Sequence, residues 1–571
     1  MSKGGRGDAR LNLAALILFL GAGLIAYRLF DIQVLQADRF QKLADEQRRT
    51  FSDLQPLRGC IVDRDGELLA ISKEAYSVYA TPYLVEDVPT AAAELSSVLE
   101  MPRQEIEDKL RSPGGFVYLQ RKVSCEVAER IESLHLAGIG LEKESKRYYP
   151  QGELAPQVLG YVGTDNVGLA GIELQYDALL AGEPGSAEME VDPRGDPIPG
   201  VTKVTREPVD GDDLQLTLDS EIQFKLQEEL ARAVEENGAL SAWGLVMDCR
   251  SGEVLAMATH PSFDTNRYSG VDVSLTRNRA ATDAFEPGSV LKVLTAMAAL
   301  QEKVVSPGSV INVPSSLKVG SYEFKDDHPM PKSDMTFSEV IAYSSNIGTI
   351  KTAMALGKDR MAEYLARSGL GKRTGLDFPG EAQGVVPTPE NWSSTTLPTV
   401  AIGQGISVTS LQLAVLVAAV ANGGVKVTPH LLMRVTHPDG SVEECAPPEG
   451  ERLISQEAAA ALRQILGEAV RMGTGGRAAM TLYNCGGKTG TAMKPDPRGG
   501  YRDAYMASFA GFAPSEDPRL VVVINVDEPD SVYGGVAAAP YFSRVMEFAL
   551  QHLEVPPSRE KVNTREKVVT Q

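Results

Sequence analysis

The chain has 571 residues, of which 43% are apolar and 23% are charged, a composition typical of a globular protein. Because this length exceeds what one hydrophobic core usually holds, we expect two or more domains. The 56 basic and 76 acidic residues give a net charge of -20, which repels the phosphate backbone and argues against nucleic acid as a partner.

The first strong element is an uncharged run, LNLAALILFLGAGLIAY, at residues 11–27, which follows three basic residues. At about 1.5 Å per residue such a helix nearly crosses the hydrocarbon core of a bilayer, so we predict a cytoplasmic tail at 1–10 and a transmembrane helix at 11–30. The preceding basic residues predict a cytoplasmic N-terminus and place the rest of the chain outside the cytoplasmic (inner) membrane. A buried core helix and a cleavable signal peptide are alternatives, but no clear cleavage site follows the run.

The next 175 residues or so lack long periodic segments. Residues 31–49 keep helical spacing and indicate a juxtamembrane stalk, whereas turn-forming pairs beyond Thr50 indicate short strands and loops with a few helices. We therefore predict a mostly-β pedestal, a non-catalytic domain at 31–205, and a connector at 201–213 that leads into the next domain.

The pattern after this connector predicts a domain at 210–555. We expect a strand at 214–218, a helix at 220–237 capped by Asp219 or Ser220, and a hairpin at 242–258. Further strands are expected at 506–512 and 520–526, before a helix near 539–553. These elements predict an α+β domain whose sheet is built from both ends of the domain. The polar tail at 556–571 is expected to be disordered.

Neither the cysteines nor the histidines form a recognisable ligand set. The five cysteines contain no CxxC pair and their number is odd, so we interpret them as mostly buried thiols rather than as disulfides or zinc ligands. The six histidines contain no HExxH motif, and we expect neither a metal nor a cofactor.

Three short motifs occur in order in the second domain, and together they are the signature of penicillin-binding enzymes: Ser289-Val290-Leu291-Lys292, Ser344-Ser345-Asn346 and Lys488-Thr489-Gly490-Thr491. An SxxK pattern alone is common, and this chain has two others, beginning at Ser315 and Ser558. Ser289 is favoured because it opens a breaker-free apolar run, which predicts a buried helix with Lys292 one turn along the same face.

These residue types suit acyl transfer through a serine nucleophile. A serine hydroxyl needs a base, and Lys292 is the available one, provided that burial and a second cation, Lys488, lower its pKa. Ser344 could relay a proton to the leaving amine, and Asn346 could bind a substrate amide, although Ser-Ser-Asn alone would more often be a helix cap.

The third motif indicates a strand with little side-chain bulk on one face. An extended peptide could lie against the backbone of Thr489, Gly490 and Thr491. The backbone N–H groups of Ser289 and Thr491 could then form an oxyanion hole, each donor contributing about 3 kcal/mol to the transition state.

Over nearly its whole length the chain resembles the class B penicillin-binding proteins. Besides the three motifs, residues 58–66, 147–152 and 168–173 resemble the pedestal motifs of that family. The resemblance implies a transmembrane helix, an elongated pedestal and a transpeptidase domain with an antiparallel sheet between helices. The sequence of residues 403–414 is more similar to that of the cell-division branch than to that of the elongation branch. The sporulation enzymes share much of this sequence.

The resemblance also implies an activity and partners. A family member would be a D,D-transpeptidase that cross-links peptidoglycan stem peptides through an acyl-enzyme on Ser289 and is inhibited by penicillin and other β-lactams. It would work with a septal glycosyltransferase of the SEDS type and with other division proteins. Alternative functions are a β-lactam sensor and a β-lactamase, for which the sequence offers neither a large cytoplasmic part nor an evident deacylating base.

Overall fold

The computed structural model describes residues 5–40, 49–190, 203–496 and 498–558. The chain forms two compact units, one made of residues 1–57 and 182–210 and the other of residues 58–181 and 211–571. The predicted tail beyond residue 558 and much of the predicted stalk lie outside the described residues.

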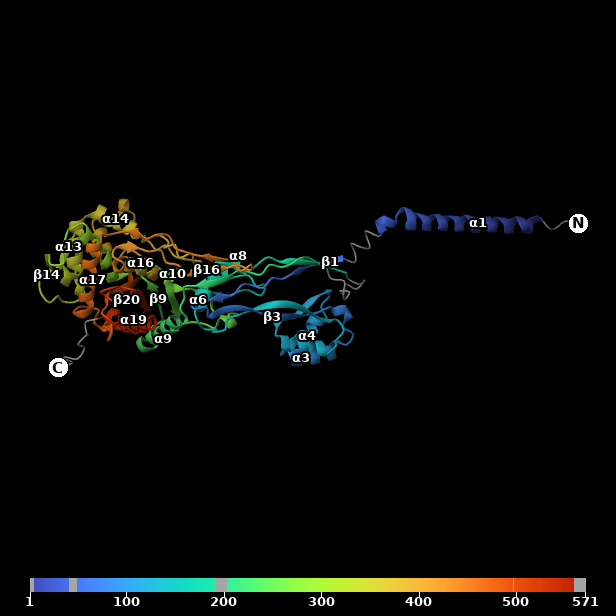
Figure 1. Cartoon of the computed structure of the whole chain (residues 1–571), viewed down its shortest axis with the longest axis horizontal. Helices are drawn as coiled ribbons and strands as arrows, with labels where there is room; N and C mark the ends of the chain where they lie inside the picture. The colour runs from blue at the N-terminus through green and yellow to red at the C-terminus, as the bar shows by residue number, and fades with distance from the viewer. Residues whose placement is uncertain (1–4, 41–48, 191–202, 497, 559–571) are drawn as a thin grey trace. The chain divides into compact units, whose positions relative to one another are not determined.

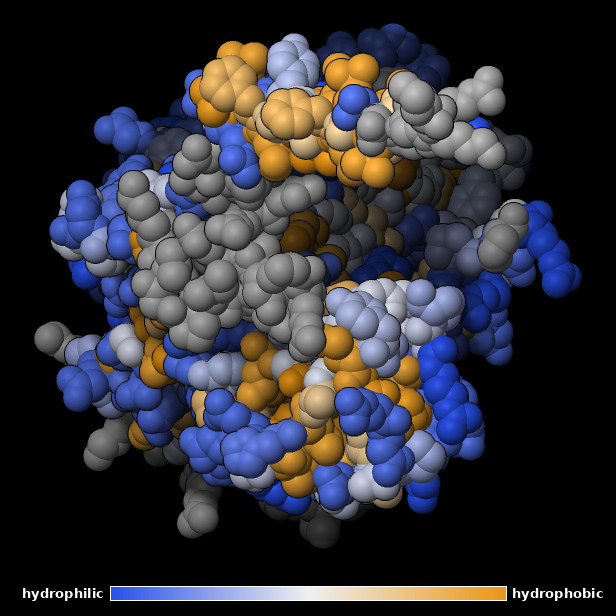
Figure 2. Space-filling model, turned by 90° about the vertical axis from the view of Figure 1, so that its right-hand side faces the viewer, coloured by the Kyte–Doolittle hydropathy of each residue, from blue (hydrophilic) through white to orange (hydrophobic). Residues whose placement is uncertain are grey.

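The first unit holds the long N-terminal helix α1 (Gly5–Phe30), which continues into a π-helical turn, η1 (Asp31–Leu35). Residues 9–35 form a helix long and apolar enough to cross a membrane, and an 18-residue window within it has a mean hydropathy of 2.1 and no buried residue. Hydrophobic residues such as these are orange in Figure 2. The helix begins at Gly5 and therefore includes residues 5–10 of the predicted tail.

The same unit contains a small antiparallel sheet in the order β1-β6-β7 (Arg49–Leu54, Gly185–Glu190 and Lys203–Arg206). One sequence-based expectation is wrong here, because Arg49 begins a strand instead of ending a helical stalk. Residues 203–206 of the predicted connector form β7. Both segments are short and polar, so that strand pairing, which the sequence pattern does not reveal, decides their conformation.

The pedestal part of the second unit combines strands with helices. Its strands are β2 (Ile61–Val62), β3 (Leu68–Ala80), β4 (Val117–Val123) and β5 (Ile139–Tyr148). Helices α3 (Val88–Leu99), α4 (Arg103–Leu110) and α5 (Cys125–Ser133) bury Leu95, Ile106 and Ile131 in a separate core beside β3 and β4. The short elements here are η2 (Pro82–Leu84), α6 (Pro156–Leu159), α7 (Gly171–Gln175) and α8 (Asp177–Leu180).

One sheet joins the pedestal to the C-terminal part of the same unit. Its strand order is β17-β16-β8-β2-β3-β4, with β5 paired to β3. The strands β8 (Asp213–Leu216), β16 (Leu432–Thr436) and β17 (Val442–Glu444) come from the C-terminal part. The pedestal and the C-terminal part are therefore connected through continuous backbone hydrogen bonding.

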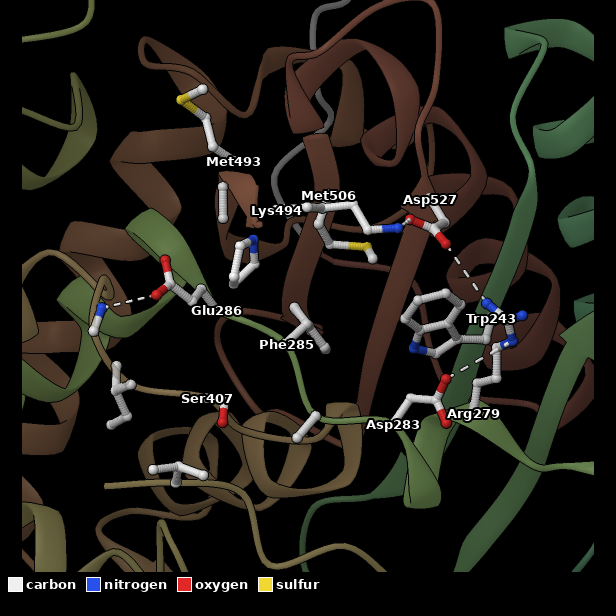
Figure 3. A pocket seen from close by; sticks show the side chains of 16 residues that line it. Trp243, Arg279, Asp283, Phe285, Glu286, Ser407, Met493, Lys494, Met506 and Asp527 are labelled. Carbon is white, nitrogen blue, oxygen red and sulfur yellow. Dashed lines mark hydrogen bonds and ion pairs between the residues drawn. The ribbon is translucent and has the colours of Figure 1, made fainter. Parts of the chain in front are cut away.

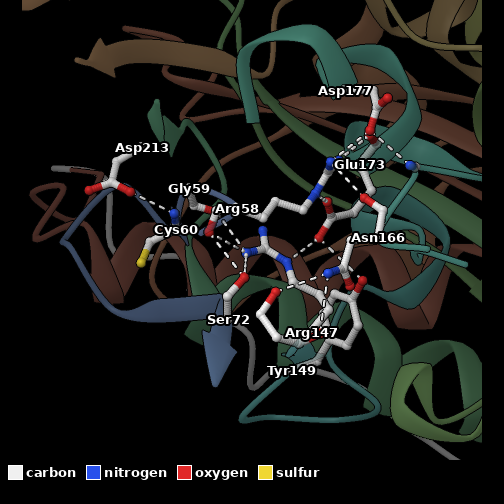
Figure 4. A network of polar contacts seen from close by, with 12 residues as sticks. Arg58, Gly59, Cys60, Ser72, Arg147, Tyr149, Asn166, Glu173, Asp177 and Asp213 are labelled. Atoms are coloured by element: carbon white, nitrogen blue, oxygen red, sulfur yellow. Dashed lines mark hydrogen bonds and ion pairs between the residues drawn. The ribbon is translucent and has the colours of Figure 1, made fainter. Parts of the chain in front are cut away.

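A buried ion network lies where the three pedestal motifs meet (Figure 4). Glu173 accepts from Arg58 Nε and from Arg147 Nε, each at 2.6 Å, and both arginines are nearly inaccessible to solvent. Arg58 Nη1 also lies 2.6 Å from Asp177 Oδ1. Because buried charges are tolerated only when they are paired, these residues hold the pedestal loops together.

The C-terminal part is built on a five-stranded antiparallel sheet in the order β10-β9-β21-β20-β19. Figure 1 labels two of its strands, β9 and β20. These strands are β9 (Ser241–Asp248), β10 (Val254–His260), β19 (Gly486–Pro495), β20 (Tyr501–Ala513) and β21 (Leu520–Asp527). Helices α9 (Ser220–Asn237) and α19 (Ala539–His552) cover one face. Helices α11 (Lys292–Gln301), α16 (Ser410–Ala421) and α17 (Gln456–Arg471) pack on the other.

This arrangement confirms the predicted sheet between helices, and the expected helix at 220–237 has Asp219 as its N-cap. The remaining elements are η3 (Thr265–Arg267), η4 (Val273–Thr276), α10 (Arg279–Thr282), η5 (Gly288–Leu291), β11 (Val310–Asn312), β12 (Leu317–Val319), β13 (Tyr322–Phe324), β14 (Asp334–Thr336), α12 (Phe337–Ala342), α13 (Asn346–Leu356), α14 (Lys358–Arg367), η6 (Pro389–Asn391), α15 (Thr396–Ala401), β15 (Val425–Lys426), β18 (Glu451–Arg452), η7 (Gly476–Ala478) and α18 (Gly534–Ala537).

Candidate active site

Ser289 lies in the single 3₁₀ turn η5, which leads directly into the buried helix α11. The preceding Gly288 has φ +51°, a left-handed conformation that glycine adopts without strain. The side chain of Lys292 is completely buried at the first position of α11, whereas Ser289 remains partly exposed. The apolar run after Ser289 therefore provides a rigid, dry base under a reachable hydroxyl.

The Ser-Ser-Asn segment joins α12 to α13. Ser344 has a left-handed backbone with φ 60°, Ser345 caps α13 through a bond from the N–H of Gly348, and Asn346 is the first residue of α13. The segment is thus a helix cap, as its sequence alone suggests, but it also faces Lys292. Lys292 Nζ donates to Ser344 O at 2.6 Å, to Ser344 Oγ at 3.2 Å and to Asn346 Oδ1 at 2.7 Å.

The strand β19 carries the third motif along the edge of the sheet and packs closely against η5. A Cβ atom on Gly288 would lie 2.6 Å from the backbone oxygen of Thr491 and 3.4 Å from its nitrogen. A Cβ atom on Gly490 would lie 2.8 Å from Pro287 O. The two glycines therefore allow the backbones of Ser289 and Thr491 to approach each other.

Burial lowers the pKa of both lysines. It lowers the pKa of Lys292 to about 8, while the carboxylates of Asp327 and Asp326 act in the opposite direction. The pKa of Lys488 lies well below its usual value, because its amine is buried and the ammonium of Lys292 is close. Burial is the largest cause of the lowered pKa at both lysines, and the expected repulsion between the two amines adds to it at Lys488.

These residues surround a cleft of about 390 Å³. Ser289, Ser344, Thr489 and Thr491 line it directly, together with Asp327, His328, Thr474, Gly476, Arg477, Tyr533, Gly534, Gly535 and Val536. Ser289 Oγ and Lys292 Nζ form no hydrogen bond here, which is common for catalytic pairs in the absence of substrate. The structure brings together the residues of all three motifs, although they are far apart in sequence.

Several lining residues carry no recognisable sequence signal. Asp327 accepts a bond from Asn346 Nδ2 at 3.3 Å. Its neighbour Asp326, which does not line the cleft, accepts from Ser345 Oγ and from the N–H of Ile347. Thr474 Oγ1 lies 2.8 Å from Thr489 Oγ1, and the N–H of Gly534 donates to Thr491 Oγ1 at 3.3 Å. A pattern search could not find these residues, because only tertiary packing brings them to the cleft.

A second cavity, of about 430 Å³, lies beside the cleft under the C-terminal end of β19 (Figure 3). Its wall contains Phe285 and Glu286, just before Ser289, and a chain of ion pairs in which Asp527 contacts both Arg279 and Lys494. Although it is slightly larger, this cavity contains none of the motif side chains proposed to act in catalysis. We therefore consider the smaller cleft as the site of chemistry.

The burial of the cysteines differs in part from the expectation of mostly buried thiols. Cys249 and Cys485 are buried, whereas Cys60, Cys125 and Cys445 are partly exposed, and all five are free thiols. Within the described ranges, no group of three or more histidine, cysteine or acidic side chains is arranged to hold a metal ion.

Comparison with known proteins agrees with this architecture. Residues 243–547 match the penicillin-binding protein transpeptidase domain, and residues 53–216 match the penicillin-binding protein dimerisation domain. The chain is 34% identical to the penicillin-binding protein PbpB of Mycolicibacterium smegmatis, over 96% of this chain and 90% of that protein. It is 33% identical to the peptidoglycan D,D-transpeptidase FtsI of Escherichia coli, over 96% and 92%.

Two further similarities extend the comparison. Stage V sporulation protein D of Bacillus subtilis is 32% identical over 97% of this chain and 86% of that protein. The crystal structure of penicillin-binding protein 3 from Mycobacterium tuberculosis in complex with aztreonam superposes with a TM-score of 0.71 at 32% identity, covering 90% of this chain and 99% of that one. With both domain matches in one polypeptide and relatives of this similarity over almost its full length, the chain belongs to the class B penicillin-binding proteins.

Proposed function

We propose that the chain is a peptidoglycan D,D-transpeptidase that acts through an acyl-enzyme on Ser289. The observation that carries this proposal is the convergence of three motifs on one cleft, above a buried amine whose pKa is about 8. An amine with such a pKa is partly neutral near physiological pH and can accept the proton of a serine hydroxyl.

The first half-reaction would form the acyl-enzyme. Lys292 Nζ takes the proton of Ser289 while Ser289 Oγ bonds to the carbonyl carbon between the two D-alanines. The N–H groups of Ser289 and Thr491 stabilise the oxyanion. The bond to the terminal D-alanine then breaks, and its amine receives the proton through Ser344, which accepts a hydrogen bond from Lys292 Nζ at 3.2 Å.

The second half-reaction would reverse these proton movements. An amine of a neighbouring stem peptide attacks the ester, its proton returns through Ser344 and Lys292, and Ser289 is released as the hydroxyl. Asn346 and the backbone of Thr489 and Gly490 hold the peptide. A β-lactam would enter the same path, but its leaving nitrogen stays attached to the acyl group and the ester persists.

The nucleophile is tested by mass spectrometry after exposure of the chain to a labelled penicillin. The label is expected on the peptide that contains Ser289 and is expected to be lost in Ser289→Ala. Ser315→Ala is the matched control, because Ser315 begins another SxxK pattern outside the cleft. A label that survives Ser289→Ala would overturn the assignment.

The type of reaction is tested with a donor peptide that ends in D-alanyl-D-alanine and with an added amine. A transpeptidase releases D-alanine and transfers the acyl group to the amine. A β-lactam sensor would keep the label without turnover, and a β-lactamase would hydrolyse the penicillin rapidly.

We further propose a septal role with a single-pass anchor. The segment at 403–414 and the similarity to the D,D-transpeptidase FtsI support this role over elongation, although the sporulation relative is nearly as similar. Depletion is then expected to produce filamentous cells, and round dividing cells would contradict the proposal. Copurification with a septal SEDS-type glycosyltransferase tests the predicted partner.

The basic residues before α1 favour a cytoplasmic N-terminus and an extracytoplasmic catalytic domain. Protease added to intact spheroplasts should then digest the region beyond residue 50. We also propose the pedestal at 31–205 and the transpeptidase domain at 210–555 as the functional domains, and after cleavage within 205–210 the penicillin label should be found only on the fragment that begins near residue 210.

A further inference from the structure

The active-site cleft has charges of opposite sign among its lining residues. Asp327 lies on the side of Ser344 and Asn346 and accepts a hydrogen bond from the Asn346 amide at 3.3 Å. Arg477 belongs to η7, which follows Thr474. A ligand with a free carboxylate is therefore repelled by the Asn346 side and attracted to the side of Thr474 and Arg477.

Arg477 has an unused hydrogen-bonding capacity. In the part of the chain that the structure describes, no carboxylate, carbonyl or aromatic ring pairs with its guanidinium, which is exposed to the cleft. The neighbouring Arg471 lies near Glu468, and Arg463 donates to Ala421 O. A guanidinium is always charged at physiological pH and offers a planar set of donors that matches a carboxylate.

The lysines cannot replace this charge. Both amines are buried and neither lines the cleft, and desolvation lowers both pKa values. The Lys292 amine also already donates hydrogen bonds to Ser344 and Asn346. His328 is the other basic residue that lines the cleft.

Two threonine hydroxyls lie on the same side of the cleft. Thr491 Oγ1 accepts the N–H of Gly534 at 3.3 Å, which leaves its own hydrogen free to be donated to a ligand. Thr489 Oγ1 lies 2.8 Å from Thr474 Oγ1, three residues before Arg477. A carboxylate placed on these two hydroxyls would therefore face the loop that carries Arg477.

This loop is firmly attached to its surroundings. The N–H of Thr474 donates to Ala342 O at 3.2 Å, and the N–H of Gly475 donates to Ala469 O at 3.0 Å. Gly473 is so close to α12 that an added Cβ would lie 2.1 Å from Ala342 O. Because the backbone is held between α12 and α17, η7 presents Arg477 from a fixed position.

We propose that Arg477 binds the C-terminal carboxylate of the donor peptide, together with the hydroxyls of Thr489 and Thr491, and that it binds the carboxylate of β-lactams in the same way. This inference rests on the proposed transpeptidase function and names the residue that recognises the charged end of its substrate. With the carboxylate on this side, the scissile carbonyl lies toward Ser289, and the side of Asp327 stays free for the amine of the acceptor.

The test compares a charged ligand with its uncharged counterpart. Second-order rates of Ser289 acylation are measured with benzylpenicillin and with benzylpenicillin methyl ester, for the wild type, Arg477→Gln, Arg477→Lys and Arg471→Gln. A hydrogen-bonded charge typically contributes about tenfold to hundredfold in rate or affinity. Arg477→Gln should lose about that factor with benzylpenicillin and less than about twofold with the ester.

Arg471→Gln is the matched control, because it removes the same charge six residues earlier, at an exposed position that does not line the cleft. It should react like the wild type with both ligands, and Arg477→Lys should recover part of the loss. Equal losses with both ligands would mean that Arg477 is only structural, and unchanged rates would mean that it binds nothing; either result overturns the inference. Absence of a label on wild-type Ser289 would instead refute the proposed function itself.

Discussion

At the scale of single residues, the central feature is a pair of buried amines beside a serine. Lys292 and Lys488 are among the largest fully buried side chains of the described chain, and burial disfavours their charged forms. Asp327 opposes this effect for both amines, since its carboxylate faces the same cleft. The balance between burial and the carboxylates of Asp327 and Asp326 therefore sets the protonation of the proposed base.

Replacement of Lys292 should slow the acylation of Ser289 severely. General-base catalysis typically contributes about 10²–10⁴-fold, so Lys292→Ala should slow acylation of Ser289 by roughly that factor. The rate is measured by mass spectrometry at fixed penicillin concentration. Lys358→Ala, at the exposed start of α14, is the control and should be as fast as the wild type. Acylation of Lys292→Ala at a near-normal rate would exclude Lys292 as the base.

The pH dependence follows from the same lysine. Its amine is active when neutral, so the acylation rate should rise with pH and level off above a pKa of about 8. The pKa is lower in the folded state than the usual 10.5, so between these values the unfolded state binds more protons. The contribution of Lys292 to stability should therefore increase with pH from about 8 to 10.5. A flat acylation profile between pH 6 and 9 would contradict this assignment.

At the scale of elements, the contact between η5 and β19 determines whether the two proposed oxyanion donors meet. Gly288→Ala would place a methyl group 2.6 Å from Thr491 O, and its backbone is left-handed. The two segments must then separate, and loss of one oxyanion donor typically costs about 10²–10³-fold in rate. We expect a loss of acylation of that order with a folded protein.

Gly308→Ala is the matched control for this prediction. Gly308 is exposed and nothing lies within 4 Å of an added Cβ. The acylation rate and the melting temperature of Gly308→Ala should equal those of the wild type. If Gly288→Ala also reacted normally, the close approach of η5 and β19 would not be needed for catalysis.

The ion network of the pedestal should matter for stability. Glu173→Ala would leave the buried guanidinium groups of Arg58 and Arg147 without their common partner. Removal of one member of a buried pair typically costs about 3–5 kcal/mol in the free energy of unfolding. Urea unfolding followed by circular dichroism measures this loss.

An exposed ion pair provides the comparison. Glu183 pairs with Arg206 at 2.7 Å, and both side chains are more than half exposed. Glu183→Ala should cost less than about 1 kcal/mol, because water screens the pair. Equal effects of the two substitutions would show that the buried network does not hold the pedestal loops.

At the scale of the whole molecule, α1 is the feature that separates anchoring from catalysis. Its exposed side chains include Leu11, Phe19 and Leu24, and the helix is not buried against the described remainder of the chain. Exposed hydrophobic surface of this kind is stable in lipid and causes aggregation in water. The catalytic cleft belongs entirely to the second compact unit.

Removal of residues 1–30 should therefore release a soluble protein. We expect the full chain in the membrane fraction and the truncated chain in the soluble fraction, with equal rates of acylation by penicillin. Cell fractionation and the labelling assay measure the two properties independently. A truncated chain that stays bound to membranes would reveal a second attachment site in the remaining chain.

Much of this protein could be predicted from local sequence patterns. The apolar run of α1, the cap and helix at 219–237, the hairpin of β9 and β10, and the strands β20 and β21 each depend on neighbouring residues. The three motifs likewise predicted one cleft, and residues of all three line the same cleft in the structure. Local patterns succeed here because periodicity and capping act over a few residues.

The tertiary structure decided what these patterns could not. It placed Asp327 near both lysines, Arg477 beside the KTG strand, and Gly534 against Thr491. It also turned three pedestal fragments into one ion network and showed that burial of Lys292 lowers its pKa. Burial, pairing and electrostatic environment depend on residues distant in the chain, so no local pattern contains them.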